Sequence, residues 1–224
     1  MKANHSTKGF TRPELLLSIG ISVATVAVAY AAATGPVAAG AQLEPTAKTG
    51  KAMHTWMQAY ANDNNQQFPT TKGASNEAFR ELFVRRLIDS EQLFAIPGDA
   101  WLKNAPGGGK KPDNDIGLGP KFQQAVAPGE CSWAYVTGLG TQSSSTLPIL
   151  ATAFSEKTGV YSKDKAAKGG VFAGRSIWIT VAGSAKIADP EADLTVAEKK
   201  DGKSVNIYSK EWGTKPENVR NPAE

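Results

Sequence analysis

The sequence predicts an α+β fold in which helices come first and an antiparallel β-sheet follows. Two stretches in the first half, 46–62 and 75–90, repeat apolar side chains at helical spacing, whereas the second half holds runs rich in β-branched and aromatic residues. Helices followed by consecutive strands are typical of an antiparallel sheet with its helices segregated to one side. Ahead of both stretches lies an apolar segment of membrane length.

The N-terminal residues carry the most specific pattern in the chain. Residues 1–9 are polar and basic, and from Leu15 to Leu43 there is no charged residue and no histidine. As a helix, Leu15–Gly35 would extend about 31 Å, which is enough to span a bilayer. Glu14 is the last charge before this segment, and a carboxylate at the end of a membrane helix is costly unless something neutralises it. The position of Glu14 therefore predicts a partner for its charge.

The run from Gly9 to Leu16 (GFTRPELL) resembles the N-terminal signature of type IV pilins and type II secretion pseudopilins. The resemblance implies that a membrane peptidase cleaves between Gly9 and Phe10 and methylates the new amine. It also implies that Glu14 pairs with the terminal amine of a neighbouring subunit during assembly. The implied fold is pilin-like, with a long N-terminal helix, half of it apolar and of membrane length, packed on the antiparallel sheet.

The same resemblance implies partners and a location. The partners would be copies of this chain, other pilin-like subunits, the prepilin peptidase and the inner-membrane assembly machinery. The precursor would lie in the bacterial inner membrane with its globular domain on the periplasmic side, and would join an extracytoplasmic filament after assembly. The implied division is a leader at 1–9, an apolar transmembrane and assembly helix at 10–44 and a globular domain at 45–214. Residues 215–224 contain two prolines and few apolar residues, which predicts a mobile tail.

Three other interpretations of the apolar segment stay open. A conventional signal peptide could be cleaved near Ala31–Ala33 or Ala38–Gly40, although Glu14 lies where such a peptide is basic and the apolar stretch is long for its core. A simple membrane anchor explains the length but neither Gly9-Phe10 nor Glu14. A buried core helix would have to be apolar on every side. The alternative function is a membrane-anchored or secreted binding protein, or a hydrolase with a conventional signal peptide.

The two helical stretches each present one apolar face. Pro36 and Pro45 interrupt the region before the first of them, since an interior proline removes a helix hydrogen bond. In 46–62 an apolar stripe predicts a face packed on the sheet; it consists of Met53, Trp56, Met57 and Tyr60. In 75–90, Ser75 is a suitable N-cap, and the expected buried residues are Phe79, Leu82, Phe83, Leu87 and Ile88.

Four runs in the second half predict strands bounded by turn residues. A turn at 182–185 leads into a further extended pair, Lys186-Ile187, and residues 106–119 have the Gly, Lys and Asp content of an exposed loop. The predicted strands are Cys131–Val136, Leu147–Phe154, Val171–Val181 and Ser204–Tyr208.

Composition and charge narrow the function classes. A chain of 224 residues with 41% hydrophobic and 21% charged residues is ordinary for a globular protein. The formal net charge is +4, and removal of Lys2 and Lys8 with the leader would lower it, so the charge gives no reason to expect nucleic-acid binding. Cys131 is the single cysteine, so no intrachain disulfide can form.

The chain offers few side chains for catalysis. Beside His5 in the leader, His54 is the only histidine, and with one cysteine it gives no spacing typical of a zinc site or a Cys-His dyad. Neither a phosphate-binding loop nor a dinucleotide fingerprint occurs. We therefore expect no enzyme activity, no catalytic residue, no cofactor and no resident metal, and a structural or solvent-facing role for His54.

Two acidic clusters stay open as calcium sites. Asp113 and Asp115 lie in a Gly-rich loop, and oxygen ligands on a flexible loop suit calcium, but the distal glutamate of an EF-hand is missing. The second cluster is Asp189, Glu191 and Asp193. A solvated acidic loop is the simpler interpretation of both.

Overall fold

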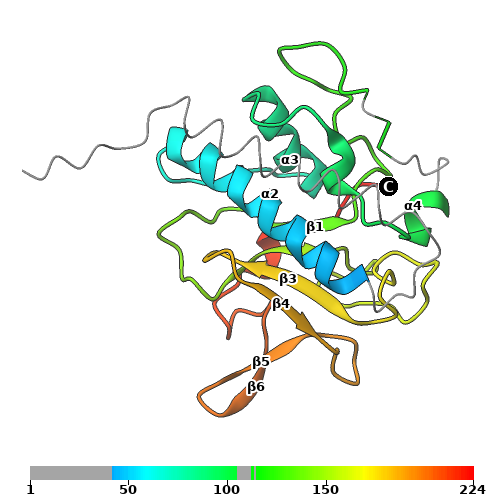
Figure 1. The fold of residues 1–224 in the computed structure, drawn as a ribbon. Helices are drawn as coiled ribbons and strands as arrows, with labels where there is room; N and C mark the ends of the chain where they lie inside the picture. The colour runs from blue at the N-terminus through cyan, green and yellow to red at the C-terminus, as the bar shows by residue number, and fades with distance from the viewer. Residues whose placement is uncertain (1–41, 105–111, 114) are drawn as a thin grey trace, which may run out of the picture.

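The computed structural model describes residues 42–104, 112–113 and 115–224 (Figure 1). Three α-helices are present in this part of the chain: α2 (Leu43–Asp63), α3 (Ser75–Val84) and the short α4 (Ala100–Asn104). Two 3-10 turns, η2 (Glu91–Phe94) and η3 (Pro216–Asn218), accompany them. The strands of the described residues are β1 (Trp133–Val136), β2 (Pro148–Thr152), β3 (Ser176–Thr180), β4 (Ala185–Ala188), β5 (Ala197–Lys200), β6 (Lys203–Asn206) and β7 (Val219–Arg220).

Five of the strands form one antiparallel sheet in the order β4-β3-β2-β1-β7. Tyr135 of β1 lies opposite Leu150 of β2 on one side and Arg220 of β7 on the other. Strands β5 and β6 form a separate antiparallel hairpin, which projects at the bottom of Figure 1. Helix α2 lies across one face of the five-stranded sheet, and α3 lies beyond it on the same side (Figure 1).

Both faces of the central strands are covered. Along β1, Trp133 and Tyr135 belong to the core under the helices, whereas Ala134 and Val136 belong to a second core on the opposite face. The second core is closed by side chains from the later loops and the hairpin, among them Tyr161, Val196, Ile207, Tyr208 and Val219. Strands buried on both faces need apolar residues at consecutive positions, which explains why β1, β2 and β3 show no polar alternation.

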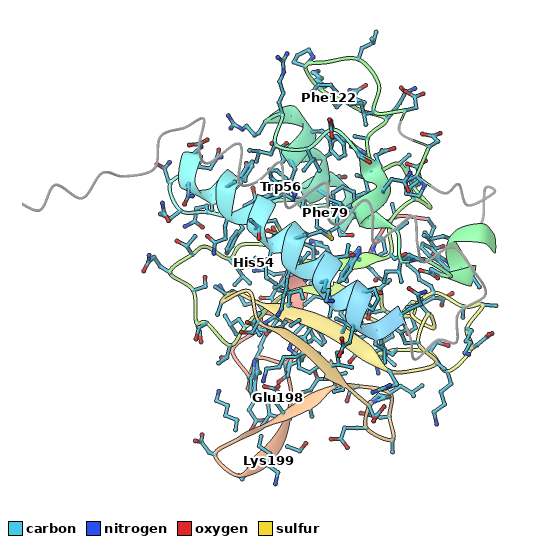
Figure 2. All side chains as sticks on the ribbon, in the orientation of Figure 1. His54, Trp56, Phe79, Phe122, Glu198 and Lys199 are labelled. Atoms are coloured by element: carbon cyan, nitrogen blue, oxygen red, sulfur yellow. The ribbon has the colours of Figure 1, made fainter. Side chains whose placement is uncertain are left out.

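The apolar stripes predicted on the two helices are largely confirmed. Met53 and Met57 are fully buried in the helix-side core, and Trp56 is buried beside them, whereas Tyr60 is only partly buried. On α3 the expected face is buried through Phe79, Leu82 and Phe83. The helix ends at Val84, so Leu87 and Ile88 lie beyond it and are only partly buried, and Ala74 rather than Ser75 is its N-cap. Figure 2 marks Trp56 and Phe79 where the two helices approach the sheet. The stacked pair Phe79 and Phe94, with ring centroids 5.0 Å apart, joins α3 to the turn η2.

The predicted fold class is wrong. It placed a long N-terminal helix, half of it apolar and of membrane length, on an antiparallel sheet. The sheet is present, but the described residues hold seven strands against three α-helices, and none of these helices combines the length and the hydropathy that a membrane span needs. Helix α2 begins at Leu43 and exposes Glu44, Lys48 and Lys51, so it is amphipathic rather than apolar on all sides. Pro45 falls within its first turn, where proline is tolerated.

Residues 215–224, which the sequence predicted as a mobile tail, instead contain η3 and β7 and pair with β1. The side chain of Asn221 donates to the carbonyls of Phe154 and Ser155 and accepts from the amide of Phe154. The amide of Ala223 donates to Asn76 Oδ1 at 2.7 Å. This segment therefore ties the start of α3 to the loop that follows β2.

Candidate functional sites

The residues predicted to carry processing and assembly, Gly9, Phe10 and Glu14, lie outside the described residues. The same holds for the predicted leader 1–9 and for the apolar segment 10–44 up to Ala41. Their roles remain predictions from the sequence.

The carboxylates of the first acidic cluster accept hydrogen bonds from the backbone of their own loop. The amide of Asp115 donates to Asp113 Oδ1 at 2.8 Å, and the amide of Gly117 donates to Asp115 Oδ1 at 3.1 Å. Each carboxylate thus accepts from the backbone two residues later, which is the geometry of an Asx turn. Asp113 and Asp115 shape the loop that leads to Leu118, which is almost fully exposed.

The second acidic cluster is dispersed among separate partners. Arg175 Nε lies 2.8 Å from Asp189 Oδ1, close enough for an ion pair but not aligned for a hydrogen bond. Glu191 accepts from the hydroxyl of Ser204, and Asp193 accepts from the side chain and the amide of Thr195, which lower the pKa of Asp193. Among the residues that the structure describes, no group of three or more histidine, cysteine or acidic side chains is placed to hold a metal ion.

His54 and Cys131 occupy structural positions. His54 is buried, its Nε2 lies 2.9 Å from the carbonyl oxygen of Val181, and burial lowers its pKa, so the neutral ring donates one hydrogen bond to that carbonyl. Cys131 is fully buried just before β1 in the chain, and desolvation raises the pKa of its thiol to about 12. A thiol with so high a pKa is a poor nucleophile at neutral pH.

Three buried carboxylates were not anticipated from the sequence. Asp99 accepts from the hydroxyl of Ser132 at 2.7 Å and from the amide of Trp101, and desolvation raises its pKa. Glu91 accepts from the amide of Val126, and Glu130 from the amide of Ala127. Each carboxylate satisfies a backbone donor. The bonds from Val126 to Glu91 and from Ser132 to Asp99 join residues more than 30 positions apart, so they depend on the tertiary path of the chain and leave no mark in local sequence.

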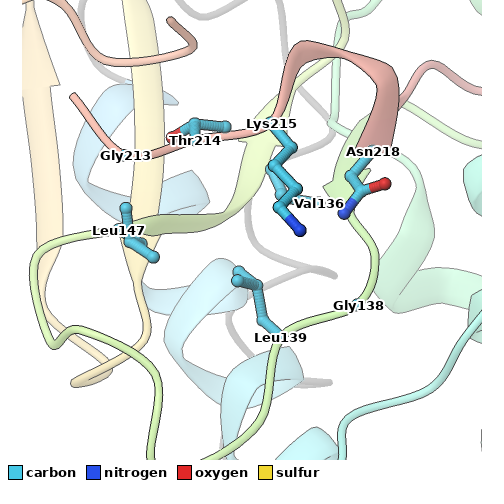
Figure 3. Close-up of a pocket in the computed structure, with 8 residues that line it drawn as sticks. All are labelled: Val136, Gly138, Leu139, Leu147, Gly213, Thr214, Lys215 and Asn218. Atoms are coloured by element: carbon cyan, nitrogen blue, oxygen red, sulfur yellow. The ribbon is translucent and has the colours of Figure 1, made fainter. Parts of the chain in front are cut away.

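A small pocket lies where β1 ends and the segment before β7 passes over it (Figure 3). Its volume is about 70 Å³. Val136, Leu139 and Leu147 give it an apolar lining, whereas Lys215 and Asn218 bring an ammonium and an amide to it. Its other residues are Gly138, Gly213 and Thr214. We call this hollow the Leu139 pocket. The sequence did not predict it, because residues about 75 positions apart line it.

A second hollow, with a volume of about 410 Å³, is lined by residues 117–124 alone. It is the inner side of one exposed loop and not a cleft between elements.

Comparison of the chain with protein-family models, with curated proteins and with solved structures finds no match.

Proposed function

We propose that this chain is a structural subunit of a type II secretion pseudopilus or a type IV pilus-like filament, processed by prepilin peptidase and assembled through its N-terminal apolar segment. One observation carries the proposal: Gly9, Phe10 and Glu14 stand at the offsets of the prepilin signature, directly before the uncharged stretch 15–43. A conventional signal peptide or a simple anchor accounts for the stretch but not for these three residues.

The physical chemistry of this arrangement is consistent. Before assembly the apolar segment lies in lipid, and in a filament it lies among copies of itself, so its surface avoids water in both states. Glu14 can remain near the lipid headgroups, and in the filament it can meet the positively charged amine of Phe10 from a neighbouring subunit. A carboxylate and an amine that are both desolvated stabilise each other, whereas either one alone is costly.

The described domain supports a membrane boundary ahead of α2. The uncharged stretch ends at Leu43, where α2 begins, and the next residues place Glu44, Lys48 and Lys51 on the exposed face of the helix. Charged side chains at this density are unfavourable in hydrocarbon. We therefore infer that the part of the chain from about Leu43 onward is presented outside the bilayer.

Mass spectrometry of the mature N-terminus in the native membrane tests the proposal. The expected product begins at Phe10 and carries one methyl group on its amine. Gly9→Leu should leave a full-length precursor in the membrane, because the residue before the cut must fit a tight peptidase subsite, and Ser6→Leu in the same leader serves as the control that is still cleaved. A mature chain that begins near Ala41, or normal maturation of Gly9→Leu, would contradict the proposal and favour a secreted binding protein or hydrolase.

A further inference from the structure

We propose that the globular parts of two copies of this chain bind each other head to tail, with Leu118 of one copy inserted into the Leu139 pocket of the next. The proposal concerns a surface of the described domain. It does not rest on the N-terminal segment or on the function proposed above.

The inserted group is the most exposed large apolar side chain of the described residues. Leu118 is 92% exposed, and the next, Ile187, is only 40% exposed. The loop holds Leu118 outward through its own hydrogen bonds, since the amide of Phe122 donates to the carbonyl of Leu118 at 3.2 Å and the amide of Gly117 donates to Asp115. The loop is anchored on α3 by Arg80, whose Nε donates to the carbonyl of Ala125.

The Leu139 pocket has the size and lining for such a side chain. An apolar cavity of about 150 Å³ holds a six-carbon benzene ring, so a pocket of about 70 Å³ suits about three carbons. The side chain of leucine has three carbons beyond its Cβ. Leu139 and Leu147 are only partly buried and face this space, so an inserted leucine would remove apolar surface of both from water (Figure 3).

The charges around Leu118 and around the Leu139 pocket are complementary. Asp115 precedes Leu118 in the loop and Lys121 follows it, whereas Lys215 lines the pocket and Glu217 follows it. All four are exposed. Among the described residues, the ammonium of Lys215 has no hydrogen bond or ion pair, nor has the side chain of Asn218, so both are available to a carboxylate. Asp115 can meet Lys215 while Lys121 meets Glu217.

Leu118 and the Leu139 pocket lie in different parts of the molecule. The loop that carries Leu118 and Phe122 projects beyond α3 at the top of Figures 1 and 2, whereas the pocket lies between the end of β1 and the segment that leads to β7. A contact between two different surfaces of identical chains leaves Leu118 of one copy and the Leu139 pocket of the other copy unoccupied in every pair. Such a contact therefore propagates into a ring or an open helical array.

Disulfide cross-linking of the full chain in membranes tests the contact. Two differently tagged chains are co-expressed, one with Leu118→Cys and the other with Leu139→Cys, and oxidised with copper phenanthroline. We expect a covalent dimer that carries both tags, because the proposed contact places residue 118 of one copy beside residue 139 of the next, and a disulfide forms where two Cβ atoms can approach to roughly 3.5–4.5 Å. The native Cys131 is buried with a raised pKa and gives a low background.

A control replaces Leu139→Cys by Lys199→Cys, which places a more exposed thiol on the β5-β6 hairpin, away from the pocket (Figure 2). The specific pair should give at least ten times more dimer than the control. Glu217→Lys in the Leu139→Cys chain should lower the yield several-fold, and Lys121→Glu in the Leu118→Cys chain should restore it. Equal yields from the pocket and hairpin cysteines, or cross-links only to other proteins, would overturn the proposal. N-terminal processing is measured separately, so failure of the filament proposal and failure of this contact are distinguishable.

Discussion

Gly50, in the middle of α2, sets how closely this helix approaches the sheet. A Cβ at this position would lie 2.8 Å from the side chain of Ile179 and 3.0 Å from that of Trp133. A glycine in a helix interior is unfavourable by about 1 kcal/mol relative to alanine, so its presence here is explained by close packing and not by helix propensity.

We predict that Gly50→Ala destabilises the domain by about 1–3 kcal/mol, because overpacking of a filled core outweighs the gain in helix propensity. Urea unfolding of the detergent-solubilised chain measures this through tryptophan fluorescence, since all five tryptophans lie in the described residues. Lys51→Ala, exposed on the same helix, is the control and should change stability little. Ile179→Val should recover part of the loss, and a Gly50→Ala chain as stable as the parent would contradict the packing argument.

His54 makes the stability of the domain depend on pH. Burial lowers its pKa below the ordinary value of 6.5, so below pH 6.5 the unfolded chain binds a proton that the folded chain does not. The free energy of unfolding should be independent of this group above pH 6.5 and should fall as the pH drops from 6.5 toward the lowered pKa, by at most about 1.4 kcal/mol per pH unit.

His54→Gln keeps a donor for the carbonyl of Val181 but cannot titrate. Urea midpoints measured between pH 7 and pH 5 should therefore fall less steeply for His54→Gln than for the parent chain. Parallel pH profiles of the two chains would show that the buried ring does not contribute to the pH dependence.

Among the elements, β7 is followed by Asn221, whose side chain ties this segment to the loop after β2. Removing this side chain leaves the amide of Phe154 and the carbonyls of Phe154 and Ser155 without their partner, and each lost or unsatisfied buried hydrogen bond costs about 1 kcal/mol or more. We predict that Asn221→Ala lowers the free energy of unfolding by about 2–3 kcal/mol, measured by the same urea titration.

Asn218 provides a matched control, because it is the same residue type in the same segment and its side chain has no hydrogen-bond partner among the described residues. Asn218→Ala should therefore be close to neutral. Similar effects of the two substitutions would mean that the segment is held by its backbone alone.

The elements found from the sequence are those with strong local patterns. Helix α3 and strands β1, β2 and β3 fall within predicted stretches, and α2 covers the predicted stretch 46–62 and extends beyond it at both ends. An apolar face at the right period has to be buried somewhere, so it can be found from the sequence. Strand β5 was missed because its residues, Ala-Glu-Lys-Lys, are mostly polar; the signal that could have found it is the turn Asp201-Gly202, whose positive φ angles of 52° and 80° suit a two-residue hairpin. Strand β7 has two residues, and only its pairing with β1 defines it.

The candidate sites also differ in whether a local sequence pattern reveals them. The motif that carries Gly9, Phe10 and Glu14 is local and can be found from the sequence, whereas the Leu139 pocket joins residues of β1 and the following turn to residues 213–218. No periodicity within either segment indicates that the two will meet. The buried Asp99 is similar, because its partner Ser132 is far away in the chain.

For the whole molecule, the decisive prediction concerns Glu14. Glu14→Ala should still insert into the membrane and be cleaved, because removal of a charge makes insertion easier. Its incorporation into filaments should fall sharply, because the amine of Phe10 would enter an apolar core unpaired.

Competition between tagged parent and Glu14→Ala chains in one culture, followed by cross-linking of the apolar segments, measures incorporation directly. Glu14→Gln is the matched control, since it keeps the shape but not the charge and should be as defective as alanine. Equal incorporation of Glu14→Ala and the parent would mean that Glu14 is only an interfacial residue.

The pairing of β1 with β7 also sets how much of the chain must be present before the sheet is complete. Tyr135 can pair with Arg220, and the amide of Ser75 can donate to the carbonyl of Asn221, only after residues 219–223 have left the ribosome. Until then the sheet and the start of α3 stay incomplete. A chain delivered through a membrane segment by segment would cross as an open polymer and close only after its late residues had arrived.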